Sequence, residues 1–124
     1  MFTNCYCGSS QPYATCCEPY IKGVEKAPKA EALMRSRYSA YVVLAADYLW
    51  NTTAPSERKK HSKSAILDWA KSNQWLKLEV LRATATIVEF KAYYLDSNLR
   101  AQVHHEVSTF VNQHGNWYYV DGEY

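Results

Sequence analysis

Residues 88–120 read VEFKAYYLDSNLRAQVHHEVSTFVNQHGNWYYV, and β-branched and aromatic residues dominate three segments of this stretch. Two groups of turn-forming residues separate the segments, DSN at 96–98 and HGN at 114–116. This pattern is typical of strands joined by tight turns. With the similar residues that precede it, the stretch predicts an antiparallel meander of four strands, at about 75–82, 83–94, 101–112 and 116–120.

Two helical segments precede these strands. The first predicted helix begins at Ala27 and ends near Trp50, since apolar residues recur in it at steps of three and four and a breaker cluster follows. The second runs from Ser56 or Ser62 to Ser72 and is expected to bury Ile66, Leu67, Trp69 and Ala70. Helices followed by a meander predict an α+β layer architecture.

The composition limits the class of protein. At 124 residues, with 48% hydrophobic and 15% aromatic residues, the chain has enough apolar side chains for one folded core and is not disordered. No apolar run approaches the roughly 18 residues of a membrane span. The N-terminus shows no basic segment followed by an apolar stretch, so we expect a cytoplasmic protein with no membrane partner.

All four cysteines, Cys5, Cys7, Cys16 and Cys17, lie within the first 17 residues. Residues 1–26 form a loop-rich module that is too short to fold by burial alone, because chains below about 40 residues usually need a metal, disulfides or a partner. Four thiolates suit a closed structural zinc site, although iron accepts the same ligands. Disulfides or free thiols remain the alternatives. Zinc bound by four thiolates would cancel the formal net charge of +2.

The cysteine segment, CYCGSSQPYATCC, resembles the SEC-C motif found at the C-terminus of the preprotein translocase motor SecA. The segments ALMRSRYSAYV, VEFKAYY, HHEVSTF and WYYVDG, beginning at residues 32, 88, 104 and 117, resemble in this order the YchJ family of uncharacterised bacterial proteins. The resemblance implies a SEC-C zinc module over residues 1–26. It implies for residues 27–124 a domain similar to nuclear transport factor 2, in which a curved antiparallel sheet wraps around helices to form a cone with a pocket.

Three residues are candidates for catalysis. Alternation along a strand places Glu106 on one face with Ser108, and His105 on the other face. Glu106 inside the cone could act as a general base, and Asp47 near the end of the first helix is a second candidate. The alternative interpretation pairs Glu106 with Arg35 or Arg37 in an ion pair and leaves His105 and Asp47 with structural or solvated roles.

A wider set of residues is expected to line the pocket or to pack in the core. Aromatic residues at helical and strand periods are usually packing residues, so the two interpretations stay open for most of the set. The candidate pocket residues are Arg35, Tyr38, Tyr41, Glu106, Ser108, Trp117 and Tyr119.

The leading functional hypothesis is a zinc-binding adaptor that docks onto a protein through its SEC-C module. The resemblance implies partners of the export-chaperone or ribosome kind. The alternative is a small-molecule-binding protein, or an enzyme of the isomerase or dehydratase type, that uses the cone pocket; a purely structural homodimer is a third hypothesis. Residues 57–63, ERKKHSK, form the one basic cluster, which predicts a solvated helix face and no nucleic-acid binding beyond a ribosomal contact.

Overall fold

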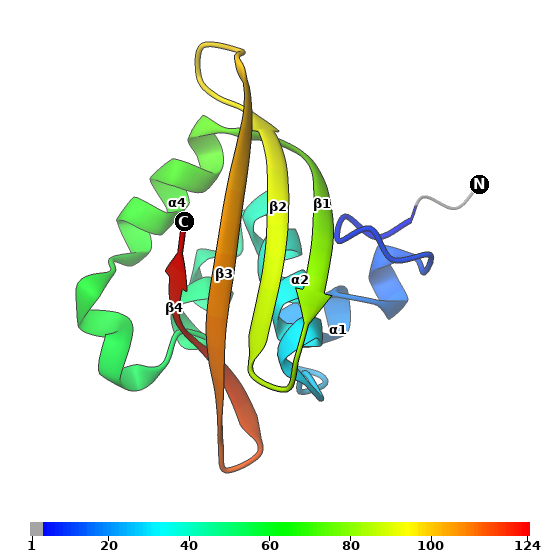
Figure 1. Ribbon diagram of the computed structural model, residues 1–124, viewed down its shortest axis with the longest axis vertical. Coiled ribbons are helices and arrows are strands. Elements are labelled where there is room, and N and C mark those ends of the chain that lie inside the picture. Colours follow the sequence, from blue (N-terminus) through cyan, green and yellow to red (C-terminus); the bar gives the residue numbers. More distant parts are fainter. Residues whose placement is uncertain (1–3) are drawn as a thin grey trace.

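A computed structural model describes residues 4–124 as two layers, a four-stranded sheet with helices against one face (Figure 1). The strands follow one another in the order β1-β2-β3-β4, and every neighbouring pair is antiparallel. The α+β meander predicted from the sequence is therefore confirmed. The strands are β1 (Gln74–Ala83), β2 (Ile87–Leu95), β3 (Ala101–Gln113) and β4 (Asn116–Glu123).

The helical elements cover the inner face of the sheet. The longest helix, α2, packs against β1, β2 and β4. Beyond the C-terminal end of α2, the helices α3 and α4 continue the helical layer. Two short 3₁₀ segments, η1 and η2, precede α1 and α4. The elements are η1 (Tyr13–Thr15), α1 (Glu18–Ile21), α2 (Ala30–Val42), α3 (Ala46–Asn51), η2 (Pro55–Lys60) and α4 (Lys63–Ser72).

The first predicted helix is in fact two helices. The backbone turns at Leu44, whose φ of +62° lies in the left-handed region that L-residues seldom adopt. The Ala45 N–H donates to the Ala40 carbonyl at 2.8 Å, which closes α2, and α3 then begins at Ala46. The turn brings Leu49 of α3 into a fully buried position. The prediction of one helix up to Trp50 was therefore wrong. Burial of Leu49 offsets the backbone strain at Leu44 that the turn requires.

The second helical segment begins at the later of the two predicted positions. The Ser62 Oγ accepts a hydrogen bond from the Ala65 N–H at 3.0 Å, so Ser62 is the N-cap of α4, and Ser56 lies in η2. Ala70 is buried as expected, but Trp69 is 40% exposed. The prediction of a buried Trp69 was wrong because this face of α4 borders an interior pocket.

The sheet bends over the helices. Register irregularities occur in β1 and between β3 and β4, and such bulges increase the twist of a sheet. The second strand begins at Ile87, four residues later than predicted, because the Thr84 Oγ accepts from the Ile87 N–H at 3.1 Å and closes a turn. Along β2 and β3 alternate residues face the helices, which gives the sheet one inner and one outer face.

The N-terminal loop packs directly onto the rest of the fold (Figure 1). Cys5, Cys7 and Cys17 are buried in the same cluster as core residues of α2 and the sheet. Gly8, with a φ of +88°, lies so close to β1 that an added Cβ would stand 3.3 Å from the Leu78 carbonyl oxygen. The first three residues of the predicted 1–26 module lie outside the described residues. Within residues 4–124, none of the helices has the length and apolar character needed to cross a membrane.

Candidate functional site

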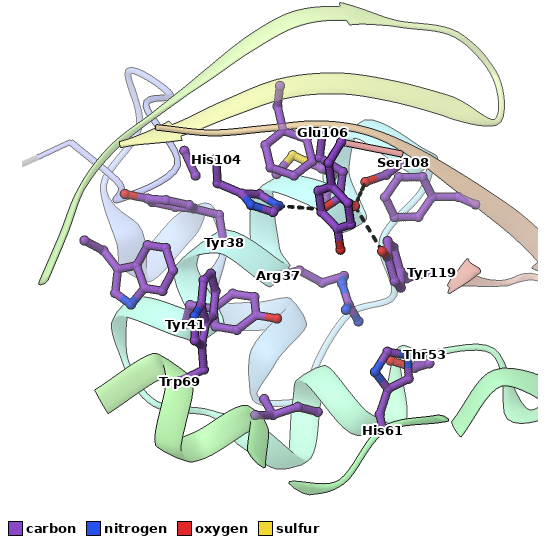
Figure 2. Close-up of a pocket in the computed structure, with 17 residues that line it drawn as sticks. Arg37, Tyr38, Tyr41, Thr53, His61, Trp69, His104, Glu106, Ser108 and Tyr119 are labelled. Carbon is purple, nitrogen blue, oxygen red and sulfur yellow. Dashed lines mark hydrogen bonds and ion pairs between the residues drawn. The ribbon is translucent and has the colours of Figure 1, made fainter. Parts of the chain in front are cut away.

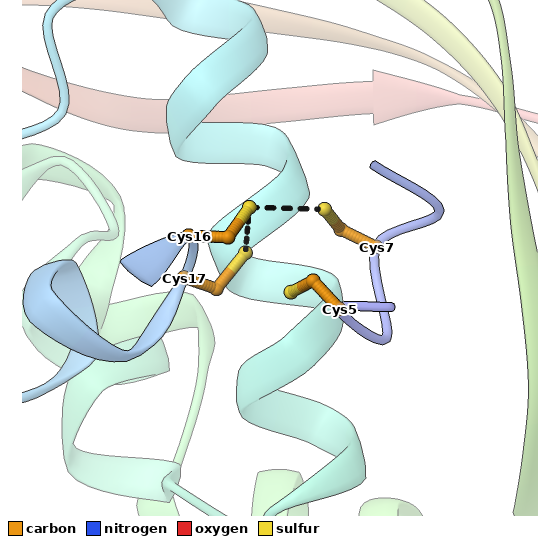
Figure 3. A group of neighbouring side chains, drawn as sticks. All are labelled: Cys5, Cys7, Cys16 and Cys17. Carbon is orange, nitrogen blue, oxygen red and sulfur yellow. Dashed lines mark hydrogen bonds between the residues drawn. The ribbon is translucent and has the colours of Figure 1, made fainter. Parts of the chain in front are cut away.

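The backbone around the cysteines consists of two tight turns. The Cys5 N–H donates to the Gln11 carbonyl at 2.7 Å and the Gly8 N–H donates to the Cys5 carbonyl at 3.1 Å, so the loop folds back on itself. The 3₁₀ turn η1 then delivers Cys16 and Cys17 to the opposite side of the cluster. Figure 3 shows the four side chains converging beside α2.

The four sulfur atoms all lie within 4.8 Å of one another. The Sγ atoms of Cys7 and Cys16 are 3.7 Å apart, and those of Cys16 and Cys17 are 3.9 Å apart. A tetrahedral zinc–thiolate site with bonds of about 2.3 Å has sulfur–sulfur edges of about 3.8 Å. The separations fit shared coordination and exceed the roughly 2.05 Å of a disulfide. The four cysteines could therefore hold a metal ion.

Hydroxyl and guanidinium groups surround the cysteine cluster. Ser9 Oγ lies 3.1 Å from the Cys16 sulfur, and Ser39 Oγ of α2 lies 3.7 Å from the Cys5 sulfur. Arg35, which was expected in the pocket, instead donates through Nη1 to the Cys7 carbonyl at 2.7 Å and through Nε to Glu31. This contact anchors the cysteine loop to α2, in the manner of the outer contacts that orient metal ligands.

A separate pocket of about 290 Å³ opens between the sheet, α2 and α4 (Figure 2). Apolar groups make up most of its wall, and the sheet arches over it. Its aromatic residues are Tyr38, Tyr41, Trp69, Trp75, Phe90, Phe110, Tyr119 and Tyr124. Its polar side chains are Arg37, Thr53, His61, His104, Glu106 and Ser108.

Glu106 is the buried charge of the pocket, with 6% of its surface exposed. Its Oε1 lies 2.7 Å from the His104 Nε2, and its Oε2 accepts from the Ser108 hydroxyl and, at 3.0 Å, from the Tyr119 hydroxyl. Burial raises the pKa of Glu106, but the hydrogen bonds from His104, Ser108 and Tyr119 outweigh it and hold the pKa below its usual value. Glu106 is therefore ionised. The predicted ion pair with Arg35 or Arg37 does not form, because the carboxylate is paired with His104. A side chain at Gly122 would overlap this carboxylate.

The ionised Glu106 determines which nitrogen of His104 carries a proton. Because the carboxylate can only accept, the His104 Nε2 must donate, which leaves the Nδ1 lone pair free in the neutral ring. Within residues 4–124 no group forms a hydrogen bond with this Nδ1. Burial, with the nearby charge of Glu106, raises the pKa of Tyr119, so Tyr119 stays a neutral donor. His104 is the better candidate for proton transfer, since Glu106 is a weak base with its oxygens engaged.

Besides Arg35, three residues predicted for the site lie outside the pocket. Asp47 lies in the first turn of α3, at its N-terminal end and not near the C-terminal end of a helix; its side chain is 82% exposed and pairs with Lys63 at 3.2 Å. His105 faces outward on β3, where its Nε2 lies 2.7 Å from Glu89. Trp117 packs against the core from β4 and does not line the pocket. These placements remove Asp47 and His105 as groups that could act on a molecule in the pocket.

Four residues of the predicted pocket set besides Glu106 do line the pocket, namely Tyr38, Tyr41, Ser108 and Tyr119. Arg37 and His104 also line the pocket and are not among the site residues predicted from the sequence. A signal for His104 was present, because a residue two positions from Glu106 on a strand shares its face. No comparable signal distinguishes Arg37 from Arg35.

Comparison with known proteins gives consistent matches over most of the chain. A family model described as "YchJ, middle NTF2-like domain" matches residues 29–122. A UPF0225 protein of Geobacter sulfurreducens is 38% identical, over 98% of this chain and 80% of its own length. A UPF0225 protein of Serratia proteamaculans is 40% identical, over 95% of this chain and 81% of its own length.

Two solved structures share the fold. The solution structure of a SEC-C motif containing protein from Rhodopseudomonas palustris matches with a TM-score of 0.90 and 37% identity, over 98% of both chains. The crystal structure of a SEC-C motif containing protein from Psychrobacter arcticus matches with a TM-score of 0.80 and 36% identity, over 94% of this chain and 80% of the other. The cysteine loop and the domain that follows it thus occur together in other bacterial proteins.

Proposed function

We propose that this chain, which belongs to the YchJ (UPF0225) family of SEC-C motif proteins with a nuclear transport factor 2-like domain, binds a small organic molecule in the pocket around Glu106. The pocket itself is the observation that supports the proposal. Ligand sites are usually concave and mostly apolar, with a few polar groups that fix the orientation of the ligand. Here aromatic walls surround a small polar set that includes Arg37, His104 and Glu106.

A fragment screen by two-dimensional NMR tests this proposal on the metal-loaded protein. Binding fragments should shift the resonances of pocket residues such as Tyr41 and Ser108. Ala92→Leu places a larger side chain at the pocket wall and should abolish these shifts, whereas Val103→Leu on the exposed part of β3 should leave them unchanged. Fragments that shift only residues outside the pocket would contradict the proposal.

We further propose that the four cysteines bind one structural zinc ion. Three of them are buried, and all four sulfurs converge, which leaves no open ligand position for catalysis. Iron accepts the same thiolates, so elemental analysis of the purified protein is the test, with one zinc per chain expected. Stoichiometric iron would overturn the choice of zinc. The proposal places the chain in the cytoplasm, where thiols stay reduced.

A reaction in the pocket is a second candidate function, of the isomerase or dehydratase kind. The observation that favours it is the His104–Glu106 pair, which orients a histidine with a free Nδ1. Bound ligands with an acidic C–H bond should exchange that hydrogen for deuterium in D₂O when the protein is present. His104→Gln should retain binding and lose the exchange. Binding by the wild-type protein without exchange in any such ligand would argue against catalysis.

Docking onto a protein partner, of the export-chaperone or ribosome kind, is the further role that we propose for the cysteine loop. Tyr6 supports it, because this aromatic side chain is 47% exposed between two of the cysteines and its ring lies 5.2 Å from that of Tyr13. Quantitative pull-downs should recover less partner with Tyr6→Ser than with the wild-type chain. Leu99→Ser, at an exposed loop far from the cysteines in sequence, is the control. Equal recovery with Tyr6→Ser and wild type would count against docking through this loop.

A further inference from the structure

Arg37 uses one side of its guanidinium to hold the fold together. Its Nη1 donates to the Leu49 carbonyl at 2.9 Å and to the Thr52 Oγ at 2.7 Å, which ties α2 to the end of α3. Its Cζ lies 4.6 Å from the centre of the Tyr119 ring, so the guanidinium rests on an aromatic surface. These contacts fix the orientation of the whole group.

The other side of the same guanidinium is unused. Arginine has five N–H donors, and the two on Nη1 are engaged, so the three on Nε and Nη2 remain. In the part of the chain that the structure describes, no carboxylate lies within ion-pair distance of Arg37. The carboxylate of the same pocket, Glu106, is paired with His104 instead. No buried side-chain nitrogen or oxygen in this part lacks a hydrogen-bond partner, so the unused donors of Arg37 are accessible and not buried. Figure 2 shows the guanidinium extending between Tyr41 and Tyr119 inside the pocket.

Two lysines line a hollow beside the pocket. This hollow shares Tyr41 and Trp69 with the pocket and adds Lys59 and Lys60 to its lining. Lys60 forms an ion pair with Glu57, and the pKa of Glu57 is lowered by Lys60 and, less strongly, by Lys59. The two lysines exceed the one carboxylate by one positive charge, and a net charge beside a pocket raises the local concentration of ligands of the opposite sign.

We infer that the pocket takes a small organic anion, with an apolar body against the aromatic wall and a carboxylate on the free Nε–Nη2 edge of Arg37. This inference rests on the proposed function, that the pocket binds a small molecule. The edge of a guanidinium matches both oxygens of a carboxylate through two parallel hydrogen bonds. Apolar walls strengthen such a pair by excluding water. Glu106 already has three donors, so Arg37 remains the free charge of the pocket.

A matched pair of probes tests the inference on the wild-type, metal-loaded chain. The acid 3-phenylpropionate and its neutral amide, 3-phenylpropanamide, have the same apolar body and differ in charge. The acid should bind about tenfold more tightly or better, because its hydrogen bonds are charge-assisted. NMR titration measures both affinities, and the Arg37 Nε–H resonance should move with the acid and not with the amide. The preference should weaken in high salt.

Variants separate the role of Arg37 from general charge. Arg37→Gln should lower the affinity of the acid to that of the amide and leave the amide unchanged. Arg100→Gln removes an exposed arginine from the β2–β3 loop and should change neither affinity. Arg37→Lys keeps the charge without the planar edge and should retain part of the preference. Because Arg37 also ties α2 to α3, the wild-type comparison of the two probes stands even where a variant does not fold.

The outcomes distinguish this inference from the proposed function. Equal binding of acid and amide in the pocket would overturn the inference and leave the proposed function intact. An acid preference that persists in a folded Arg37→Gln protein would also overturn it. Absence of binding by both probes would overturn it as well, and the broader fragment screen would then decide alone whether the pocket binds small molecules.

Discussion

Glu106 is a buried carboxylate whose charge is stabilised by hydrogen bonds from two strands. His104 and Ser108 stand two residues before and after it on β3, and Tyr119 reaches it from β4. A buried carboxylate without such donors would take up a proton. The sheet alone therefore builds the anionic part of the pocket, and α2 adds the cation, Arg37.

Removal of one donor should shift the titration of Glu106. Its folded pKa lies below the ordinary 4.5, so its contribution to stability is present above about pH 4.5 and is lost as the pH falls through the folded pKa. Tyr119→Phe should raise this pKa by roughly one unit, since a hydrogen bond to a charged group contributes about 1.5 kcal/mol or more. Carbon-13 NMR titration of the Glu106 carboxyl group measures this pKa in the wild-type and variant proteins. Tyr118→Phe, on the next residue of β4, is the control, and an unchanged midpoint in Tyr119→Phe would contradict the assignment.

The absence of a side chain at Gly122 leaves the space that the Glu106 carboxylate occupies. A Cβ there would overlap the carboxyl group, so Gly122→Ala must displace Glu106 from its three donors. We expect it to lower the free energy of unfolding by roughly 1–3 kcal/mol, as overpacking usually does. Urea denaturation measures the change, with Asp121→Ala at the neighbouring exposed residue as the control. A Gly122→Ala protein as stable as wild type would show that the carboxylate has room to move.

Single residues show where sequence patterns stop being informative. Alternation on β3 correctly groups Glu106 with Ser108. The same rule places His104 on the face of Glu106 and would have predicted that the two side chains interact. Arg35 and Arg37 are two residues apart, about 200° around a helix, so they must face different sides of α2. Which of the two arginines faces the pocket depends on where the cysteine loop packs. Arg35 donates to the Cys7 carbonyl of this loop, so Arg37 is the one on the pocket side. Only tertiary structure provides that information.

At the scale of elements, α4 forms the outer wall of the pocket. It carries Ile66 and Trp69, and the rings of Trp69 and Trp75 lie 5.0 Å apart across the wall. Turn residues made the strand ends next to the β2–β3 and β3–β4 turns predictable, because DSN and HGN have the side chains that tight turns need. The start of β2 and the end of β4 were each missed by three or four residues. The break between α2 and α3 was not predictable, because no glycine or proline marks it and Leu44 adopts the left-handed conformation.

The N-cap of α4 should make a measurable contribution to stability. Ser62→Ala removes the hydrogen bond to the Ala65 N–H and should lower the free energy of unfolding by about 1 kcal/mol. Ser56→Ala is the matched control, since this serine lies in η2 and caps no α-helix. Thermal and urea unfolding compare the two variants. A larger loss from Ser56→Ala would mean that the helix begins at the earlier serine.

At the scale of the whole molecule, the cysteine loop and the sheet share one buried cluster. Cys5, Cys7 and Cys17 belong to the same buried cluster as Leu33 and Met34 of α2, and Gly8 lies against β1. The order of motifs along the sequence predicted the YchJ family and the fold, and both are confirmed. The sequence did not show that the loop packs into the core of the domain, because spacing of cysteines reports only on their own segment.

Removal of the proposed metal ion should therefore destabilise the whole chain and not only its first residues. Without the ion, four thiols would have to stay crowded within 4.8 Å, and loss of their packing would expose the apolar side of α2. Metal binding is coupled to folding in such sites, so we expect chelation or Cys7→Ser to lower the midpoint of thermal unfolding by roughly 10 °C or more. Calorimetry should show one transition for the loaded protein, and NMR after chelation should show changes at α2 and the pocket as well as at the loop. Ser10→Ala, at an exposed position of the same loop, is the control. Unchanged pocket resonances and an unchanged midpoint after complete metal removal would show that the sheet and helices fold without the cysteine loop.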